Sequence, residues 1–287
     1  MRRGCKPLKI VVKNHIGQSV ELDSFNYPVV SVDGLTPTGA TINTSNVATV
    51  DGTFFNSSYV NQRNIVLTIT PNVEAERARL FLYQYFKPKY PVTLYFKTRT
   101  RDVYIEGYVE TFEGSLYDQK QSFQISVICP QPFFNDVKES VTELSKTVNN
   151  FTFPFYIPEE GVIFSYIDDD AEVNVKNKGE ETTGAIIQLV ANGHIVEPTI
   201  YNRTTGEKFT IMVEMSNGDN IVIDTRRGQK TIEMISDGVT TNILNKIAKG
   251  SKWLSLVQGD NIFRYDCVRG AKELNIIYTF HPLYGGI

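Results

Sequence analysis

Short runs of β-branched and aromatic residues recur along the whole chain, and residues that favour turns separate them. In the first half these runs lie at 8–32, 64–70, 92–97, 102–111 and 121–129. From Val162 onward they recur at spacings of about 8–12 residues, which is typical of a β-sandwich. The pattern therefore predicts a mainly β protein.

A helical period interrupts the strands of the first half between Asn72 and Phe86. Ala78, Leu82 and Phe86 fall on one face there, and Pro88 follows where a helix must stop. Because the strand on either side of this segment alternates apolar and polar residues, we expect one helix to lie on a half-buried antiparallel sheet.

Two local signals stand out in the second half. Asn217-Gly218 lies between the β-forming runs 209–213 and 221–223, and both central residues of a type I′ turn need positive φ. We expect a hairpin at this point. A short helix is predicted over about 241–249, because Gly250 suits a left-handed C-cap.

The length and the apolar content indicate two domains. The chain has 287 residues, of which 41% are hydrophobic, and domains commonly span roughly 100–200 residues. Pro130-Gln131-Pro132 interrupts the strands, since proline cannot donate to a sheet ladder. We predict a first domain over 1–135, a linker or crossover over 136–160 and a second domain over 161–287. The pattern leaves open which domain holds the last strand, 274–280.

The segment Thr36–Asn61 differs from its surroundings. Thr, Ser, Asn and Gly dominate it and its apolar residues are sparse, so it cannot bury much surface by itself. It predicts an extended hairpin or arm that needs a partner to lie on.

Charge and cysteine usage exclude several classes of protein. Lys and Arg number 29 against 32 Asp and Glu, so the net charge is 29 − 32 = −3, and the basic residues are scattered. This disfavours specific nucleic-acid binding. No apolar run approaches the roughly 20 residues of a membrane-spanning helix, and Ile10-Val11-Val12 is too short for a signal-peptide core. Cys5, Cys129 and Cys267 are odd in number and widely spaced, which favours reduced thiols.

Candidate catalytic groups are few. His15, His194 and His281 are isolated, and the chain has no nucleophile elbow, phosphate loop or dinucleotide fingerprint. The run Asp168-Asp169-Asp170 with Glu172 is the best acid or metal candidate, but it lacks the spacing of a calcium loop and favours a solvated loop. We expect no enzyme activity, no cofactor and no metal; a hydrolase that uses these acids is a minor alternative.

A carbohydrate-binding module that recognises host wall polysaccharide is the principal alternative function. Its aromatic platform would use the tyrosines of the second domain and Trp253, the single tryptophan of the chain. Trp253 lies in the alternating segment 252–256, so packing in the core is the favoured interpretation.

An ordered set of motifs resembles the distal tail protein family of siphophages. In the first half these are Ala78-Arg79-Leu80 with Phe86-Lys87-Pro88, then 91–96, 104–109 and 124–134. The likeness continues at 218–225, 242–244, 250–254, 259–263 and 284–287. It therefore covers essentially the whole chain.

The resemblance implies a structural baseplate hub in the virion tail, assembled in the cytoplasm of a bacterial host. Its first domain would be a tail-tube-like β-sandwich with one helix that closes into a homo-hexameric ring and leaves a channel for DNA. Its second would be a galectin-like or carbohydrate-module-like β-sandwich that projects outward. The implied partners are the tail tube protein, a tail-tip hub protein and receptor-binding proteins, without a membrane.

A ring needs contacts between copies, and the arm with its flanks is the candidate for them. Asp51-Gly52 is expected to form a turn in or beside the arm, and Arg63 to open the strand that returns to the sheet. The predicted ring contacts are Ile42, Val47, Val50, Asp51, Gly52, Phe54, Phe55 and Arg63.

Overall fold

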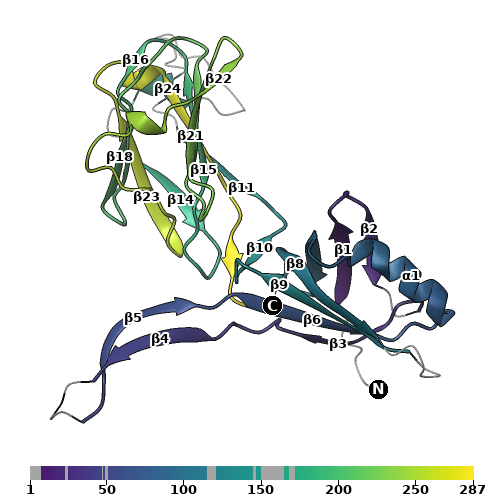
Figure 1. The fold of residues 1–287 in the computed structure, drawn as a ribbon. Coiled ribbons are helices and arrows are strands. Elements are labelled where there is room, and N and C mark those ends of the chain that lie inside the picture. The colour runs from purple at the N-terminus through teal and green to yellow at the C-terminus, as the bar shows by residue number, and fades with distance from the viewer. Residues whose placement is uncertain are drawn as a thin grey trace, which may run out of the picture. The chain divides into compact units, whose positions relative to one another are not determined.

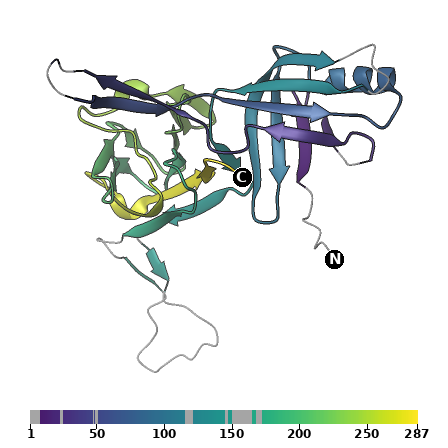
Figure 2. The ribbon, with the colours of Figure 1, turned by 90° about the horizontal axis from the view of Figure 1, so that it is seen from below.

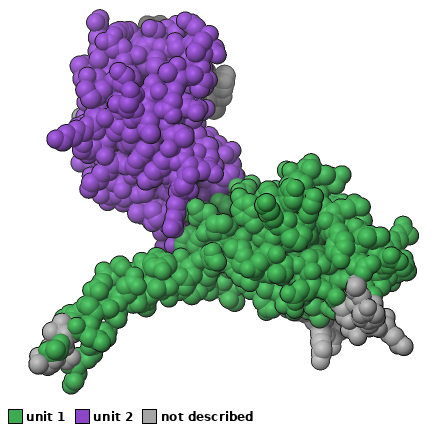
Figure 3. All heavy atoms as spheres, in the orientation of Figure 1, with its two compact units in different colours: residues 1–138, 283–287 green, residues 139–282 purple. Residues whose placement is uncertain are grey.

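A computed structural model of the chain describes residues 8–22, 25–46, 48, 51–114, 121–144, 147–149, 165–167 and 172–287. The chain divides into two compact units, coloured separately in Figure 3: unit 1 comprises 1–138 and 283–287, and unit 2 comprises 139–282. Sequence reasoning assigned every residue after 160 to the second domain, whereas the last five residues belong to unit 1. Strand 274–280, whose domain the sequence left open, lies in unit 2.

Unit 1 is built on one antiparallel sheet with the order β2-β1-β7-β8-β9-β6-β3, and β10 joins it by pairing with β8 and with β25. Its strands are β1 (Lys9–Asn14), β2 (Ser19–Leu22), β3 (Val29–Asp33), β6 (Arg63–Ile69), β7 (Pro91–Lys97), β8 (Asp102–Gly114), β9 (Phe123–Cys129), β10 (Phe134–Asp136) and β25 (Leu283–Tyr284). Alternation places one face of these strands in the core.

The predicted helix is confirmed as α1 (Ala75–Tyr85), between β6 and β7. Ala78, Leu82 and Phe86 are fully buried in the core of unit 1, as their shared face predicts. Figure 1 shows α1 beside the strands of unit 1. The helix ends at Tyr85, three residues before Pro88, and the backbone N–H of its C-cap residue, Phe86, still donates to Leu82 O.

The polar segment forms the predicted arm. Strands β4 (Ala40–Ser45) and β5 (Phe54–Val60) pair with each other alone among the strands that the structure describes. They continue β3 and β6 outward, because β3 leads into β4 and β5 leads into β6. Figures 1 and 2 both show this hairpin leaving the sheet of unit 1, and we call residues 40–60 the arm.

Unit 2 is a sandwich of two antiparallel sheets around one core. The larger sheet is β11 (Ser140–Leu144), β24 (Leu274–Phe280), β15 (Ile186–Ala191), β20 (Asn220–Asp224), β21 (Thr231–Ser236) and β22 (Val239–Asn242), in that order. The other is β14 (Val173–Asn177), β23 (Gly259–Asp266), β17 (Thr199–Asn202) and β18 (Glu207–Thr210).

Short elements complete unit 2. They are the pairs β12 (Thr147–Asn149) with β13 (Ser165–Ile167) and β16 (Ile195–Val196) with β19 (Glu214–Met215), and the 3₁₀ turns η1 (Leu244–Lys246) and η2 (Ala271–Glu273). The mainly β class with one α-helix is therefore confirmed.

Two local predictions in unit 2 are wrong. Asn217-Gly218 does form a turn, with Gly218 at φ 93°, but the flanking strands do not pair: β18 pairs with β17, and β20 with β15 and β21. The helix predicted over 241–249 is reduced to η1, because β22 pairs with β21 through the Asp237-Gly238 turn. In both places the segment pairs with a different neighbouring strand from the one that its local sequence predicts.

Candidate interaction surface

The arm exposes apolar side chains that no other described part of the chain covers. Among its described residues none is buried, and every residue of β5 is exposed. Figure 3 shows the arm standing clear of the body of unit 1. The exposed large apolar residues are Ile42 (63% exposed), Phe54 (53%), Phe55 (66%), Tyr59 (56%) and Val60 (36%). Exposed apolar residues concentrated on one element mark an interaction surface.

A β-bulge sorts these side chains onto two faces. Residues that pair across antiparallel strands share a face, and alternate residues of one strand share a face. Ala40 pairs with Val60 and Ile42 with Ser58, and after the register shift between Asn43 and Thr44 the next pair on that face is Thr44 with Phe55. Ile42, Phe55 and Val60 therefore share one face, which we call the apolar face.

The opposite face of the arm is held by polar side chains. Asn43 Nδ2 donates to Ser57 Oγ over 3.0 Å, and Ser45 Oγ donates to Asn56 Oδ1 over 3.2 Å. Phe54 and Tyr59 lie on this face, because they pair with Ser45 and Thr41. These cross-strand bonds let the ribbon keep its conformation although it has no core of its own.

The tip of the arm carries the remaining predicted contacts. Asp51 and Gly52 are exposed and lie in a bend, with Gly52 at φ 90°. Asp51 is the only charged residue between Thr36 and Gln62, so the arm is almost neutral. Val47 and Val50 lie outside the described residues.

Arg63 opens β6 as predicted, but its predicted place in a ring contact is wrong. Its side chain is 1% exposed and donates only to backbone carbonyls within unit 1. Nε reaches Pro132 O at 2.6 Å, Nη1 reaches Thr36 O at 2.7 Å and also Gly34 O, and Nη2 reaches Gly285 O at 2.6 Å. A side chain enclosed in this way has no surface to offer another chain.

Burial controls the ionisation of Arg63 and its neighbour Cys129. It lowers the pKa of the Arg63 guanidinium, an effect that its interaction with Cys129 opposes. Burial also raises the pKa of the Cys129 thiol to about 12, against the opposing charge of Arg63. The Cys129 thiol is therefore neutral at ordinary pH, and it is a packed core group rather than a nucleophile.

The tryptophan of the alternative function packs against neighbouring side chains of unit 2. Trp253 is half-buried against the core of unit 2, where Phe209 lies 5.2 Å away between ring centroids. The ammonium of Lys230 lies 5.3 Å from the centroid of the indole. A sugar platform requires an open aromatic face, so this geometry supports core packing for Trp253.

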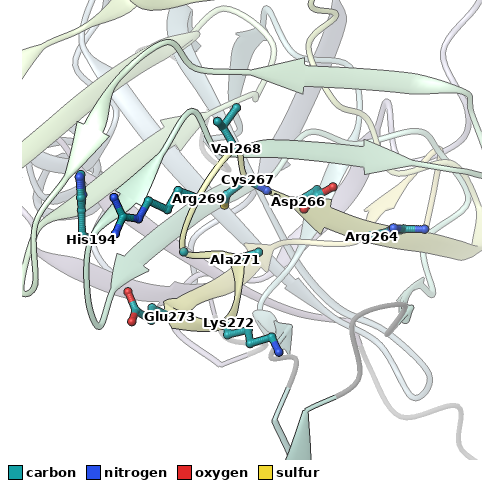
Figure 4. Close-up of a pocket in the computed structure, with 10 residues that line it drawn as sticks. His194, Arg264, Asp266, Cys267, Val268, Arg269, Ala271, Lys272 and Glu273 are labelled. Carbon is teal, nitrogen blue, oxygen red and sulfur yellow. Dashed lines mark hydrogen bonds between the residues drawn. The ribbon is translucent and has the colours of Figure 1, made fainter.

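Unit 2 carries a polar hollow of about 610 Å³ between the loop after β15 and the segment 264–273 (Figure 4). Arg264, Arg269 and Lys272 line it together with two carboxylates, Asp266 and Glu273. Figure 4 shows Arg269 extending toward the loop that holds His194. Backbone hydrogen bonds fix the loops to each other, from Val196 N to Arg269 O at 3.0 Å and from Asn192 N to Glu273 O at 2.8 Å. Basic and acidic side chains therefore line the hollow together.

The predicted titratable candidates do not come together. His15 packs on Tyr90 at 4.4 Å between centroids, while His194 and His281 each lie 3.8 Å from a single carboxylate, of Glu214 and Glu139. Glu172 pairs with Arg203, and Asp168 to Asp170 lie outside the described residues.

Within the described part of the chain no three His, Cys, Asp or Glu side chains cluster as a metal site would require. Among those same residues no helix has the length and apolar character needed to cross a membrane.

Comparison with known proteins identifies both units. The family model described as a phage tail protein RIFT-related domain matches residues 17–129, within unit 1. The model described as the C-terminal domain of the siphovirus-type tail component matches residues 178–281, within unit 2. Together these ranges cover more than half of the chain. No curated protein sequence matches it.

Solved structures share the fold along nearly the whole chain. The Dit protein of phage SPP1, described as a paradigm of the hub adsorption apparatus in phages that infect Gram-positive bacteria, aligns with a TM-score of 0.67 and 14% identity. The alignment covers 96% of this chain and 99% of that one. A chain of the phage P2 baseplate, in its activated conformation with Ca, aligns with a TM-score of 0.52 and 11% identity, over 96% and 98% of the two chains.

Each family model falls within one unit, the two follow each other in the order of the units, and the fold match spans both. These findings agree with the motifs at 78–134 and 218–287. The chain belongs to the distal tail protein family of siphovirus-type tail components, and it is a structural hub protein of a phage tail baseplate.

Proposed function

We propose that six copies of this chain close into a ring at the distal end of the tail tube, through unit 1, and that the ring leaves a channel for DNA. The single observation that carries this proposal is the arm, which is a ribbon without a core that exposes Ile42 and Phe55. Such a ribbon gains apolar burial only from another surface.

A second copy of this chain is the partner that best fits the arm. A closed ring requires heterologous contacts, in which one surface of a copy meets a different surface of the next. The arm is nearly neutral, since Asp51 is its only charge, so its contacts are apolar and polar rather than ionic. The apolar face, with Ile42, Phe55 and Val60, lies on the neighbouring copy, and Asp51-Gly52 lies at the far end of that contact.

Unit 2 carries the adhesion function in this proposal. It docks receptor-binding or other baseplate proteins, and the hollow of Figure 4 supplies a polar docking point. Arg269, which extends toward the loop that holds His194, is the basic group that an acidic side chain of a partner would meet there. In co-purification with baseplate proteins expressed from the same phage genome, Arg269→Glu should reduce capture. Unchanged capture would assign docking to another face of unit 2.

Deletion of 41–55 tests the ring assignment. The deleted protein should fold, because described residues of the arm contribute nothing to either core, and it should no longer form rings. Electron microscopy gives ring number and symmetry, and sedimentation velocity gives the mass. Val268→Ser is a matched control, since it removes an apolar side chain of unit 2 that is 74% exposed. Rings that survive the arm deletion would contradict the proposed role of the arm.

A further inference from the structure

The base of the arm is completed by residues that follow unit 2 in the sequence. Residues 34–37 lead from β3 into the arm, and we call them the arm base. The Arg63 guanidinium donates to the carbonyls of Gly34 and Thr36 in the arm base, and the same group donates to Gly285 O at 2.6 Å. One buried cation therefore ties the arm base to the C-terminal segment of unit 1.

The segment 283–287, which we call the return segment, makes further contacts with the arm base. The backbone N–H of Ile287 donates to Leu35 O at 3.1 Å. A Cβ at Gly286 would lie 2.9 Å from Pro37 Cδ, which shows how closely the two backbones approach. Arg101 donates to Gly286 O, and its guanidinium lies 4.5 Å from the centroid of the Tyr284 ring. Figures 1 and 2 both show the C-terminal end beside the strands of unit 1.

The other end of the return segment is held by β10. Phe134 pairs with Tyr284 and Asn135 with Leu283, and the Tyr284 hydroxyl donates to Asp136 Oδ2 at 3.0 Å. The Arg63 guanidinium stacks on the Phe134 ring, 4.5 Å from its centroid. The return segment thus fills the space between β10 and the arm base.

Folding of unit 2 delivers the return segment to this place. Ser140 and Phe280, which lie near the two ends of unit 2, are paired partners in β11 and β24. When this sheet forms, residue 283 comes close to residue 138, where β10 has just ended. Before it forms, the return segment is separated from β10 by a loop of the whole of unit 2, and closing such a loop has an entropic cost.

We propose that Arg63 and the return segment form a clasp that fixes the direction of the arm, so that a chain becomes competent to join a ring only after unit 2 has folded. The inference rests on the proposed role of the arm in the ring. Arg63 acts in it as a positioning residue and touches no neighbouring copy. The physical reason is that the single Arg63 guanidinium donates to four carbonyls. The carbonyls of Pro132 and Gly285 hold this guanidinium in the place where it also reaches the carbonyls of Gly34 and Thr36.

The first test is a chain truncated after Pro282, which keeps the arm and all of unit 2. Hydrogen exchange in peptides that cover 29–33, the strand β3 that leads into the arm base and pairs with β6, should speed up at least tenfold, while exchange in β7 and β8 stays unchanged. The protein concentration needed for half-maximal ring formation, measured by sedimentation, should rise at least tenfold. Tyr284→Phe is the control that keeps the return segment and removes one hydrogen bond. Exchange and ring formation equal to those of the full chain would overturn the clasp.

The second test separates the folding of unit 2 from the presence of the return segment. Ile276→Asp places a charge in the fully buried core of unit 2 and should unfold that unit with the return segment still attached. The exchange at 29–33 should then match that of the truncated chain. Protection at 29–33 that persists after unit 2 has unfolded would refute the coupling.

These outcomes are distinct from a failure of the proposed function. If the chain without 41–55 still forms rings, the arm is not the ring contact. If that chain forms no rings but the truncated chain forms them normally, only the clasp fails.

Discussion

The two phenylalanines at the start of β5 provide a test of which face of the arm is covered in the ring. Phe55 shares the apolar face with Ile42 and Val60, whereas Phe54 lies on the opposite face, because of the bulge between Asn43 and Thr44. Both are exposed in the single chain, at 66% and 53%. Phe55→Ser and Phe54→Ser are therefore matched changes of the same residue type at adjacent positions.

The magnitude follows from the exposed area. A phenylalanine buries about 200 Å² when it is covered, and Phe55 is 66% exposed in the single chain, so a neighbouring copy can cover roughly 130 Å² of it. At about 25 cal/mol per Å² this is about 3 kcal/mol for each contact. Since about 1.4 kcal/mol corresponds to a tenfold change, Phe55→Ser should weaken association about 100-fold.

The assay is the concentration dependence of ring formation by sedimentation velocity, with electron microscopy to confirm the rings. Phe55→Ser should shift the midpoint by tenfold or more and Phe54→Ser by about threefold or less. Unfolding of the isolated chains should change by less than about 0.5 kcal/mol for either variant, since both side chains are exposed. Equal shifts, or a larger shift for Phe54→Ser, would refute the assignment of the apolar face.

Three further predictions concern the interiors of the two units. Gly34→Ala should destabilise unit 1 by more than about 2 kcal/mol in denaturant unfolding, because Gly34 has φ 86° and a Cβ would lie 2.1 Å from Asn64 O. Gly238→Ala is the control: Gly238 has φ 77° but open space around it, so this change should lower the free energy of unfolding of unit 2 by only about 1 kcal/mol. Cys129 has a pKa raised to about 12 from 9.0, so the stability contributed by its neutral thiol is fully present below pH 9 and is lost as the pH rises toward 12. Cys129→Ala should therefore reduce the slope with which the free energy of unfolding of unit 1 falls at alkaline pH, by up to about 1.4 kcal/mol per pH unit. Equal slopes in the two proteins would contradict this. Tyr278→Phe should leave unit 2 as stable as before or stabilise it by about 1 kcal/mol in thermal unfolding. The reason is that the buried hydroxyl of Tyr278 has no hydrogen-bond partner in the described structure. A loss of stability above about 1 kcal/mol would show that the hydroxyl has a partner.

Sequence reasoning was most accurate where a pattern is periodic and local. Spacing alone predicts the helix face of Ala78, Leu82 and Phe86 and the strands on either side of it. An amphipathic helix or strand buries its apolar face, and the spacing of the apolar residues shows which face that is. The arm followed from composition in the same way, because a segment with few apolar residues has too little surface to bury.

Pairing was predicted less well. Asn217-Gly218 has the sequence of a hairpin turn, and the turn is present, yet its flanking strands join different neighbours. Likewise, a residue type does not reveal which segments it will bridge. Arg63, next to an exposed arm, has the appearance of a contact residue, and only the convergence of Gly34, Thr36, Pro132 and Gly285 around it shows that it is internal.

The amino-acid order by itself determined the β class, the single helix, the existence of the arm and, through its ordered motifs, the family. These properties depend on residues close together in the chain, whose spacing is visible in the sequence. The tertiary structure decided which face of the arm is apolar, that Arg63 is enclosed, and that residues 283–287 return to unit 1. Such features depend on strand register and on contacts between segments far apart in the chain, such as Arg63 and Gly285, which are 222 positions apart. Local sequence preferences encode neither the register nor these contacts.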